Sequence, residues 1–213
     1  MNPIYPLVLL LSYLCGSIPI GLITGKMVKG IDIREYGSGN IGATNVWRTL
    51  GPVCGSIVFA ADVAKGLIPV VAAHHLPHIS PWFIVFTGLA AITGHNASPF
   101  LKFKGGKGVA TSVGVALGFS PAAALIGFGF WALVLAVTRY ISISSILAVP
   151  IACVLIWILN GYTLPYAVFG VLVSLYVLVK HKSNIARVKA RTEPKVTLPS
   201  ILMKLFHGGS QSA

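Results

Sequence analysis

Val109-Ala-Thr-Ser-Val-Gly-Val-Ala-Leu-Gly-Phe119 is a short apolar segment, and it decides how often this chain crosses a membrane. Six longer apolar runs surround it, at residues 4–24, 54–74, 82–98, 121–138, 141–159 and 164–180. Each run is about long enough to cross a ~30 Å hydrocarbon core as a helix. Because 55% of the 213 residues are apolar and only 9% are charged, we predict an all-α integral membrane protein.

The basic residues indicate which ends of these runs face the cytoplasm. Of the 16 Lys and Arg residues, four lie in 25–53, three in 99–108 and seven in 180–213. Basic loops tend to stay on the cytoplasmic side, so six spans after an outward N-terminus would leave the basic tail outside. A seventh, short crossing at 109–119 removes this conflict. We therefore predict seven transmembrane helices, with the N-terminus outside and the C-terminus in the cytoplasm.

The seventh helix is unusual in its length. Eleven residues of helix rise only ~16 Å, so we expect neighbouring helices to bury it beside a thinned or cavity-containing region. A short helix next to a basic loop indicates a binding site. We expect no second domain: residues 1–213 form a single polytopic domain, and 181–213 form its basic cytoplasmic tail.

The first polar segment runs from Asp32 to Arg48, between two apolar runs. Its glycines allow positive φ, so successive backbone N–H groups can turn toward one anion. The candidate groups are Gly37, Ser38, Gly39, Asn40, Thr44, Asn45 and the planar guanidinium of Arg48. The spacing Gly-x-Gly-x-x-Gly also matches the dinucleotide fingerprint, but that motif needs a preceding strand and a βαβ unit. The charged residues before it and the membrane helix after it favour an anion nest instead.

The second segment, Lys102-Phe-Lys-Gly-Gly-Lys-Gly108, leads directly into the short apolar segment. Its glycines, Gly105, Gly106 and Gly108, can bring the backbone close to an anion, and Lys104 and Lys107 supply point charges. The N-terminus of the following helix adds its own attraction for negative charge. This pattern also predicts anion binding.

A third polar group lies at the end of the last apolar run. His181, Asn184 and Arg187 would share one face of a continuing helix, with Glu193 beyond them as a partner for the basic cluster. Ser142 lies on the same side of the membrane by the predicted topology. The alternative, a basic helix end that snorkels to the lipid surface, remains open for this group.

Two ionisable residues interrupt the second apolar run. Asp62 and Lys65 are spaced i, i+3 and can pair on one helix face. Either the pair is structural and orients the helix, or it supports a charged site near the cytoplasmic end. His95 and Asn96, late in the third run, are equally consistent with helix-end hydrogen bonding and with catalysis.

All three segments reach the same side of the membrane, so one composite site rich in phosphate-binding groups is expected. The chain has only four carboxylates and no paired acids, so acyl or phosphoryl transfer would depend on positioning and charge stabilisation. A substrate phosphate oxygen is then the candidate proton acceptor. From the residues alone, two alternatives stay open: a transporter or channel for organic phosphate anions, and a non-catalytic lipid-binding protein.

At these residues the chain resembles a known family. The segments are Gly16-Ser-Ile-Pro19, Gly37-Ser-Gly-Asn-Ile-Gly-Ala-Thr-Asn45, Asp62-Val-Ala-Lys-Gly66, Phe103-Lys-Gly-Gly-Lys-Gly-Val-Ala-Thr111 and His181-Lys-Ser-Asn-Ile-Ala-Arg187. In this order they are similar to the bacterial acyl-phosphate:glycerol-3-phosphate acyltransferases, the PlsY family. The resemblance implies an inner-membrane enzyme that transfers an acyl group from acyl phosphate to the 1-hydroxyl of glycerol 3-phosphate. Its products would be lysophosphatidic acid and phosphate, in the first step of membrane phospholipid synthesis.

Motifs and resemblance together assign the site. The catalytic candidates are Ser38, Arg48, Lys107, His181 and Asn184, and the binding candidates are Gly37, Gly39, Asn40, Thr44, Asn45, Lys104, Gly105, Gly106, Gly108, Ser142, Arg187 and Glu193. The residues show no clustered metal ligands, so we expect no metal, and we expect no cofactor. The expected partners are acyl phosphate, glycerol 3-phosphate and membrane lipid, with no nucleic acid and no obligatory protein partner. The active site is expected on the cytoplasmic side of the bacterial inner membrane.

Overall fold

The computed structural model of the chain describes residues 4–197, and this part contains helices and loops only. It begins with α1 (Ile4–Ser17) and α2 (Ile20–Lys29), which together are long and apolar enough to span a membrane. The expected single run of 4–24 is wrong in two respects, because it extends to Lys29 and it breaks at Ile18 and Pro19. Proline lacks a backbone N–H and disfavours helical geometry in the residue before it, which accounts for the break.

The first group of helices consists of α1, α4 (Pro52–His74), α5 (Pro81–Asn96) and α6 (Val109–Phe119). Small residues allow close approach within it. A side chain at Gly66 would meet the backbone of Thr111, and one at Gly114 would meet the backbone of Val63. Helix α6 has the predicted bounds, and its neighbours bury much of it, as expected for so short a helix.

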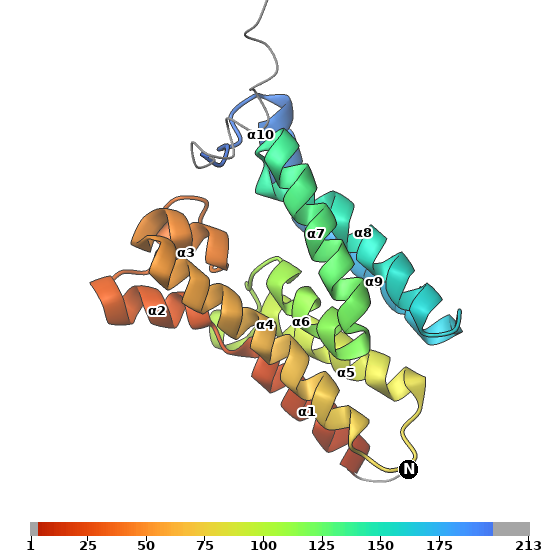
Figure 1. The fold of residues 1–213 in the computed structure, drawn as a ribbon. Helices are drawn as coiled ribbons and strands as arrows, with labels where there is room; N and C mark the ends of the chain where they lie inside the picture. Colours follow the sequence, from red (N-terminus) through yellow and green to blue (C-terminus); the bar gives the residue numbers. More distant parts are fainter. Residues whose placement is uncertain (1–3, 198–213) are drawn as a thin grey trace, which may run out of the picture.

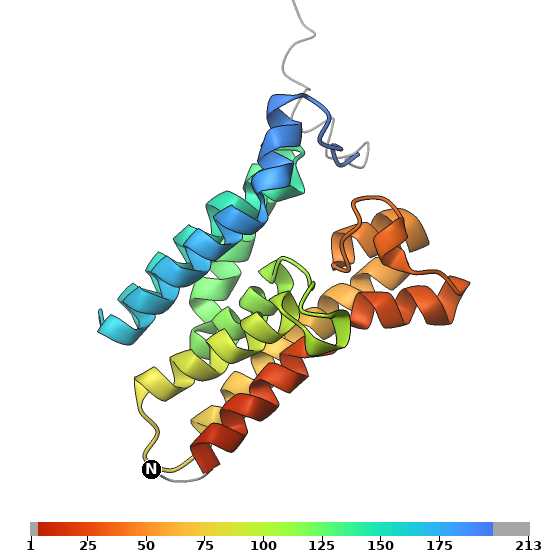
Figure 2. The same cartoon turned by 180° about the vertical axis from the view of Figure 1, so that it is seen from behind.

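The second group consists of α7 (Pro121–Thr138), α8 (Ile141–Leu159) and α9 (Leu164–Lys180), whose bounds match the predicted runs. Helix α10 (Lys182–Lys189) follows α9 after a bend of 52°. Figures 1 and 2 show the two groups diverging toward the end where α3 (Ala43–Leu50) and α10 lie. Helix α6 contacts α4, α5, α7 and α8, so it joins the two groups.

Two short 3₁₀ helices complete the described elements, η1 (Ile33–Glu35) before α3 and η2 (Pro99–Leu101) before α6. With α2 and α3, η1 forms a lobe whose own core includes Ile33, Ile41 and Val46. A side chain at Gly21 would meet the backbone of Ile41. The lobe therefore packs tightly on α2, and this contact places the first polar segment.

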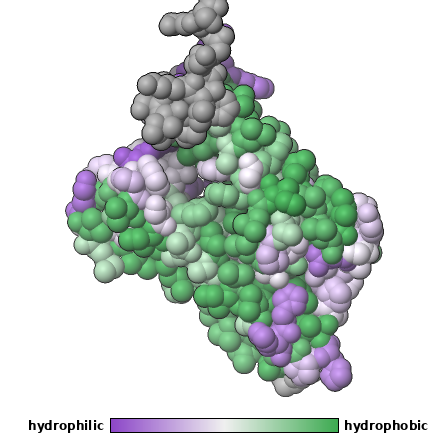
Figure 3. Space-filling view, in the orientation of Figure 1, coloured by the Kyte–Doolittle hydropathy of each residue, from purple (hydrophilic) through white to green (hydrophobic). Residues whose placement is uncertain are grey.

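Between residues 4 and 197, four helices could cross a membrane by length and composition, counting α1 with α2 as one, or up to five if α9 and α10 form a single bent span. Helices α5 and α6 have 16 and 11 residues, so each is shorter than the 18 residues of the shortest of these spans, α7. Large apolar side chains are exposed along α1, α4, α7, α8 and α9. Figure 3 shows hydrophobic residues over most of the visible helix surfaces, with hydrophilic residues gathered toward the ends of the molecule.

Candidate active site

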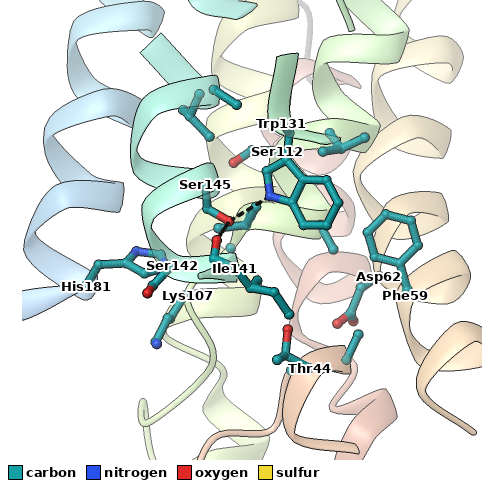
Figure 4. A pocket seen from close by; sticks show the side chains of 18 of the residues that line it. Thr44, Phe59, Asp62, Lys107, Ser112, Trp131, Ile141, Ser142, Ser145 and His181 are labelled. Carbon is teal, nitrogen blue, oxygen red and sulfur yellow. Dashed lines mark hydrogen bonds between the residues drawn. The ribbon is translucent and has the colours of Figure 1, made fainter. Parts of the chain in front are cut away.

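A cavity of about 840 Å³ lies between the two groups of helices. Residues of α3, α4 and α6 line one side, and residues of α7, α8 and α9 line the other. Polar side chains gather near the loops at one end, and the helices contribute mostly apolar side chains with a few polar ones among them. Figure 4 shows His181, Ser142 and Lys107 close together, with Thr44 and Asp62 on the opposite wall.

Asn45 organises the first polar segment. Its side-chain Nδ2 donates to the carbonyl oxygens of Ile33 (3.0 Å), Tyr36 (3.0 Å) and Asn40 (2.8 Å), and its Oδ1 accepts from the Ser38 N–H (2.8 Å). Only 1% of Asn45 is exposed. The amide therefore shapes the loop, and its predicted role as a direct substrate ligand stays a prediction.

The glycines of this segment need their unusual backbone. Gly37 has φ of +59° and Gly39 has φ of +69°, in the left-handed region that side chains disfavour. The two turns leave Ser38 exposed between them, at the cavity wall. Asn40 supports the next turn, because its Oδ1 accepts from the Gly42 N–H at 2.8 Å. The loop thus presents Ser38, Thr44 and Arg48 to the cavity.

The second segment rests on the end of α5. The N–H of Gly105 donates to the carbonyl of Asn96 (3.1 Å), and that of Gly106 donates to the carbonyl of His95 (3.0 Å). Lys107 follows, half-buried, and its Nζ donates to Asn184 Oδ1 across the cavity. This contact joins the basic loop of the first helix group to α10 beside the second.

Glu193 is the centre of the third polar group. Its Oε1 accepts from Ser142 Oγ (2.9 Å) and Asn184 Nδ2 (2.7 Å), and its Oε2 accepts from Arg187 Nε (2.7 Å). Burial alone would raise the pKa of the Glu193 carboxyl, but these hydrogen bonds hold it below its usual range. The predicted partnership of Glu193 with the basic cluster is confirmed, and Glu193 is engaged by the protein rather than free for a substrate.

His181 lies at the junction of α9 and α10, where its carbonyl accepts from the Ile185 N–H at 2.9 Å, and the expected shared face of positions 181, 184 and 187 stays a prediction. The chain bends by 52° there, and His181 ends α9 while Asn184 and Arg187 lie on α10. His181 Nδ1 lies 2.8 Å from the Val177 carbonyl, which suits an Nδ1–H donor and leaves Nε2 as an acceptor. Burial lowers the pKa of this imidazole, which favours its neutral form.

Lys107 carries the clearest electrostatic signature of the site. Burial lowers the pKa of its ammonium to about 8, and the nearby positive charges of Arg187 and Arg48 act in the same direction. Arg48 reaches over from α3, where its Nη2 donates to the Pro194 carbonyl at 3.3 Å. Cations from all three segments therefore surround one region, an arrangement that an anionic substrate would stabilise.

Most of the cavity lining is apolar. Phe59, Phe128 and Trp131 line it from α4 and α7, and Cys153 and Phe169 line it from α8 and α9. The polar edge of the Trp131 ring is satisfied, because its Nε1 donates to Ser145 Oγ at 3.2 Å (Figure 4). One cavity therefore combines a cationic end for phosphate with an apolar part that fits a hydrocarbon chain.

Comparison with known proteins identifies the family. A model of the family described as "Glycerol-3-phosphate acyltransferase" matches residues 6–191. The chain belongs to this family. The acyltransferase is therefore an enzyme that acylates glycerol 3-phosphate, and the product of that acylation is lysophosphatidic acid. Family membership also decides against the transporter and the non-catalytic protein that the residues alone left open.

Individual relatives agree with this assignment. The acyltransferase is 42% identical over 205 residues to the glycerol-3-phosphate acyltransferase of Nostoc sp. (strain PCC 7120 / SAG 25.82 / UTEX 2576), with 89% of this chain and 90% of the relative covered. It is 46% identical over 184 residues to that of Desulforudis audaxviator (strain MP104C), with 85% and 90% covered.

Solved structures are also similar. The crystal structure of PlsY (YgiH), an integral membrane glycerol 3-phosphate acyltransferase, in its glycerol 3-phosphate form superposes with a TM-score of 0.86 at 38% identity, covering 93% of this chain and 98% of that one. The lysphosphatidic acid form gives a TM-score of 0.83 at the same identity, covering 91% and 95%. The acyltransferase is thus a multi-pass integral membrane protein.

The cavity gathers most of the residues that the sequence analysis selected. Those that line it are Ser38, Asn40, Thr44, Asn45, Arg48, Lys107, Gly108, Ser142, His181, Asn184 and Glu193. Those that do not are Gly37, Gly39, Lys104, Gly105, Gly106 and Arg187. The three polar segments therefore meet at the cavity. Several of their glycines and basic residues are not among the residues that line it.

Some lining residues were not selected from the sequence. Asp62 and His95 line the cavity, as do Ser112 and Ser145. The predicted ion pair is confirmed, with Asp62 Oδ1 2.8 Å from Lys65 Nζ. The position of this ion pair inside an apolar run indicated a structural or functional role. Nothing in the sequence indicated that Asp62 lines the cavity and Lys65 does not.

Proposed function

We propose that the acyltransferase holds acyl phosphate and glycerol 3-phosphate together in this cavity and transfers the acyl group to the 1-hydroxyl. The observation that carries the proposal is the union of a cationic end with an apolar remainder in one cavity. An acyl phosphate needs both environments, since it has a dianionic head and a hydrocarbon tail. Glycerol 3-phosphate needs only the cationic end.

The proposed reaction has one acyl-transfer step. The 1-hydroxyl oxygen attacks the acyl carbonyl carbon and forms an ester bond, and the bond between that carbon and the phosphate oxygen breaks. The hydroxyl proton leaves with the phosphate, which has the acceptor oxygens to take it. Lys107 and Arg48 stabilise the phosphate charge, and the exposed Ser38 hydroxyl can donate to it.

His181 and Asn184 are proposed to orient the acceptor. His181 Nε2 can accept a hydrogen bond from a hydroxyl if Nδ1 donates to Val177. Asn184 is tied to both Lys107 and Glu193, so its position follows theirs. The reaction as proposed uses no cofactor and no metal.

We also propose the finer membrane arrangement. Seven crossings, with the first residues outside and the end of the chain in the cytoplasm, place all three basic segments on one side of the bacterial inner membrane. The convergence of Arg48, Lys107 and Asn184 at one end of the cavity supports this arrangement. Part of the predicted basic tail, residues 198–213, lies outside the described residues. A tag after residue 213 that reacts in intact cells with an impermeant reagent would contradict the topology.

The function is tested with purified protein in detergent. The protein is mixed with a long-chain acyl phosphate and glycerol 3-phosphate, and released phosphate and lysophosphatidic acid are measured in parallel. We expect equimolar amounts of both products and none when either substrate is omitted. An equal rate with an acyl thioester in place of acyl phosphate would contradict the proposed donor, and no product from either donor would contradict the site assignment.

A further inference from the structure

The polar side chains at the end of α5 are buried without partners of their own. His95 is 4% exposed and Asn96 is 2% exposed. Within residues 4–197, neither His95 Nδ1 nor either polar atom of the Asn96 amide has a hydrogen-bond partner. Burying polar groups without hydrogen-bond partners lowers the stability of the folded protein, so these side chains indicate a role other than stability. The proposed acyl transfer assigns no step to either residue.

These two residues form the surface on which the second glycine loop lies. The backbone carbonyls of His95 and Asn96 accept from the N–H groups of Gly106 and Gly105. A side chain at Gly106 would collide with the His95 imidazole at Nε2, and one at Gly108 would collide with the Asn96 amide. A side chain at Gly105 would instead collide with the backbone carbonyl of His95. The loop and the end of α5 therefore have complementary shapes.

The His95 ring is supported from behind by charged residues of the helix bundle. His95 Nδ1 lies 3.7 Å from Asp62 Oδ1, and Asp62 is paired with Lys65. Lys65 Nζ also donates to the carbonyl of Ile18 at 3.0 Å, where α1 breaks before Pro19. The pair thus connects α4 to the break between α1 and α2, where the Ile18 carbonyl also accepts from the Ile20 N–H at 3.0 Å. Helices α1, α4 and α5 together fix the position of the imidazole.

We propose that His95 and Asn96 are positioning residues that set the backbone of 105–108 and thereby hold the Lys107 ammonium in the site. The inference rests on the proposed function, because the position of Lys107 matters only if it contacts a phosphate group. The sequence predicts that the glycines of 105–108 let a phosphate approach the backbone. The contacts with His95 and Asn96 give a different reason. Gly106 is glycine because the His95 ring occupies the space that its side chain would need.

The test is a steric rescue in the full-length protein. Gly106→Ala pushes the loop off the imidazole, and His95→Ala removes the ring, so the double variant restores room for the new methyl group. We expect Gly106→Ala to lower kcat/KM about 100-fold, as a displacement of about 1 Å can. The double variant should have a kcat/KM roughly tenfold or more above that of Gly106→Ala.

Two controls make the rescue specific. Gly105→Ala meets a backbone carbonyl, which His95→Ala leaves in place, so the same second substitution should not rescue it. Gly129→Ala places a methyl group in open space on α7 and should behave as wild type. Binding of glycerol 3-phosphate is measured by calorimetry beside turnover, and the amount of folded protein is measured by size exclusion.

The outcomes separate the two proposals. Wild-type activity in Gly106→Ala, or no recovery in the double variant, overturns the positioning role. A loss of folded protein in Gly106→Ala with unchanged KM and unchanged binding indicates a purely structural contact and also overturns it. If Gly106→Ala does not fold, then recovery of folded, active protein by His95→Ala supports the role, and failure to recover refutes it. An inactive wild type that does not bind glycerol 3-phosphate overturns the proposed function itself.

Discussion

The two glycine-rich loops of the cavity have similar compositions, but different helices hold them in shape. In the first, Gly37 and Gly39 adopt positive φ, and the Asn45 amide at the start of α3 holds the turns and fills the space of a side chain at Gly37. In the second, Gly105 and Gly106 lie against the end of α5, which fills the space of the absent side chains. The first loop is shaped by a helix that follows it, and the second by a helix that precedes it. Each delivers one cation, Arg48 or Lys107, to the same cavity.

The largest expected effect comes from removing the cation of the second loop. Lys107→Met keeps an unbranched side chain that is one atom shorter, and removes its charge and its bond to Asn184. We expect kcat/KM to fall about 1000-fold, at the upper end of the loss from one preorganised donor. Phosphate release from acyl phosphate and glycerol 3-phosphate measures it. A fall of less than about tenfold would mean that the first loop alone stabilises the phosphate charge.

The cation of the first loop should be sensitive to shape as well as charge. Arg48→Lys preserves the charge and loses the planar fork, which also bonds the Pro194 carbonyl. We expect a fall of about 100-fold in kcat/KM. Lys107→Arg is the matched exchange in the other loop, measured in the same assay. If Arg48→Lys keeps wild-type activity, Arg48 acts as a point charge and the two loops are interchangeable in this respect.

The two cations should also differ in their response to pH. The Lys107 pKa of about 8 lies below its usual value because of burial and of neighbouring positive charge, so its ammonium is present below this pH and lost above it. We expect kcat/KM to fall roughly tenfold per pH unit above about 8. Arginine stays charged throughout, so Lys107→Arg should shift this fall upward by at least one unit. An unchanged alkaline limb in that variant would assign the titration to another group.

The smallest effect concerns the glycines. A side chain at Gly39 would meet little, with the Arg34 carbonyl 3.3 Å away, so its cost comes from φ of +69°. We expect Gly39→Ala to cost about 1 kcal/mol in stability of the loop. Gly39→Asn should cost less, because asparagine tolerates this conformation. Thermal unfolding and turnover of both variants measure the difference. Equal losses would show that Gly39 is needed for space, like Gly106.

Much of the fold was predictable because its signals are local. The bounds of α6, α7, α8 and α9 follow from apolar runs ended by proline, polar or basic residues. The break at Pro19 could have been read from the proline, yet its consequence could not. Lys65 donates to the Ile18 carbonyl at this break, and this contact joins residues 47 positions apart.

The sequence by itself determined the helices, the three polar segments and the family to which they belong. Each depends on composition over a short window or on the order of motifs along the chain. The tertiary structure alone decided how these residues are used. It turned Asn45 and Glu193 inward as structural partners, brought Asp62 and His95 to the cavity, and placed α5 behind Gly106. Such roles depend on distances between segments far apart in the chain, and apolar periodicity carries no information about those distances.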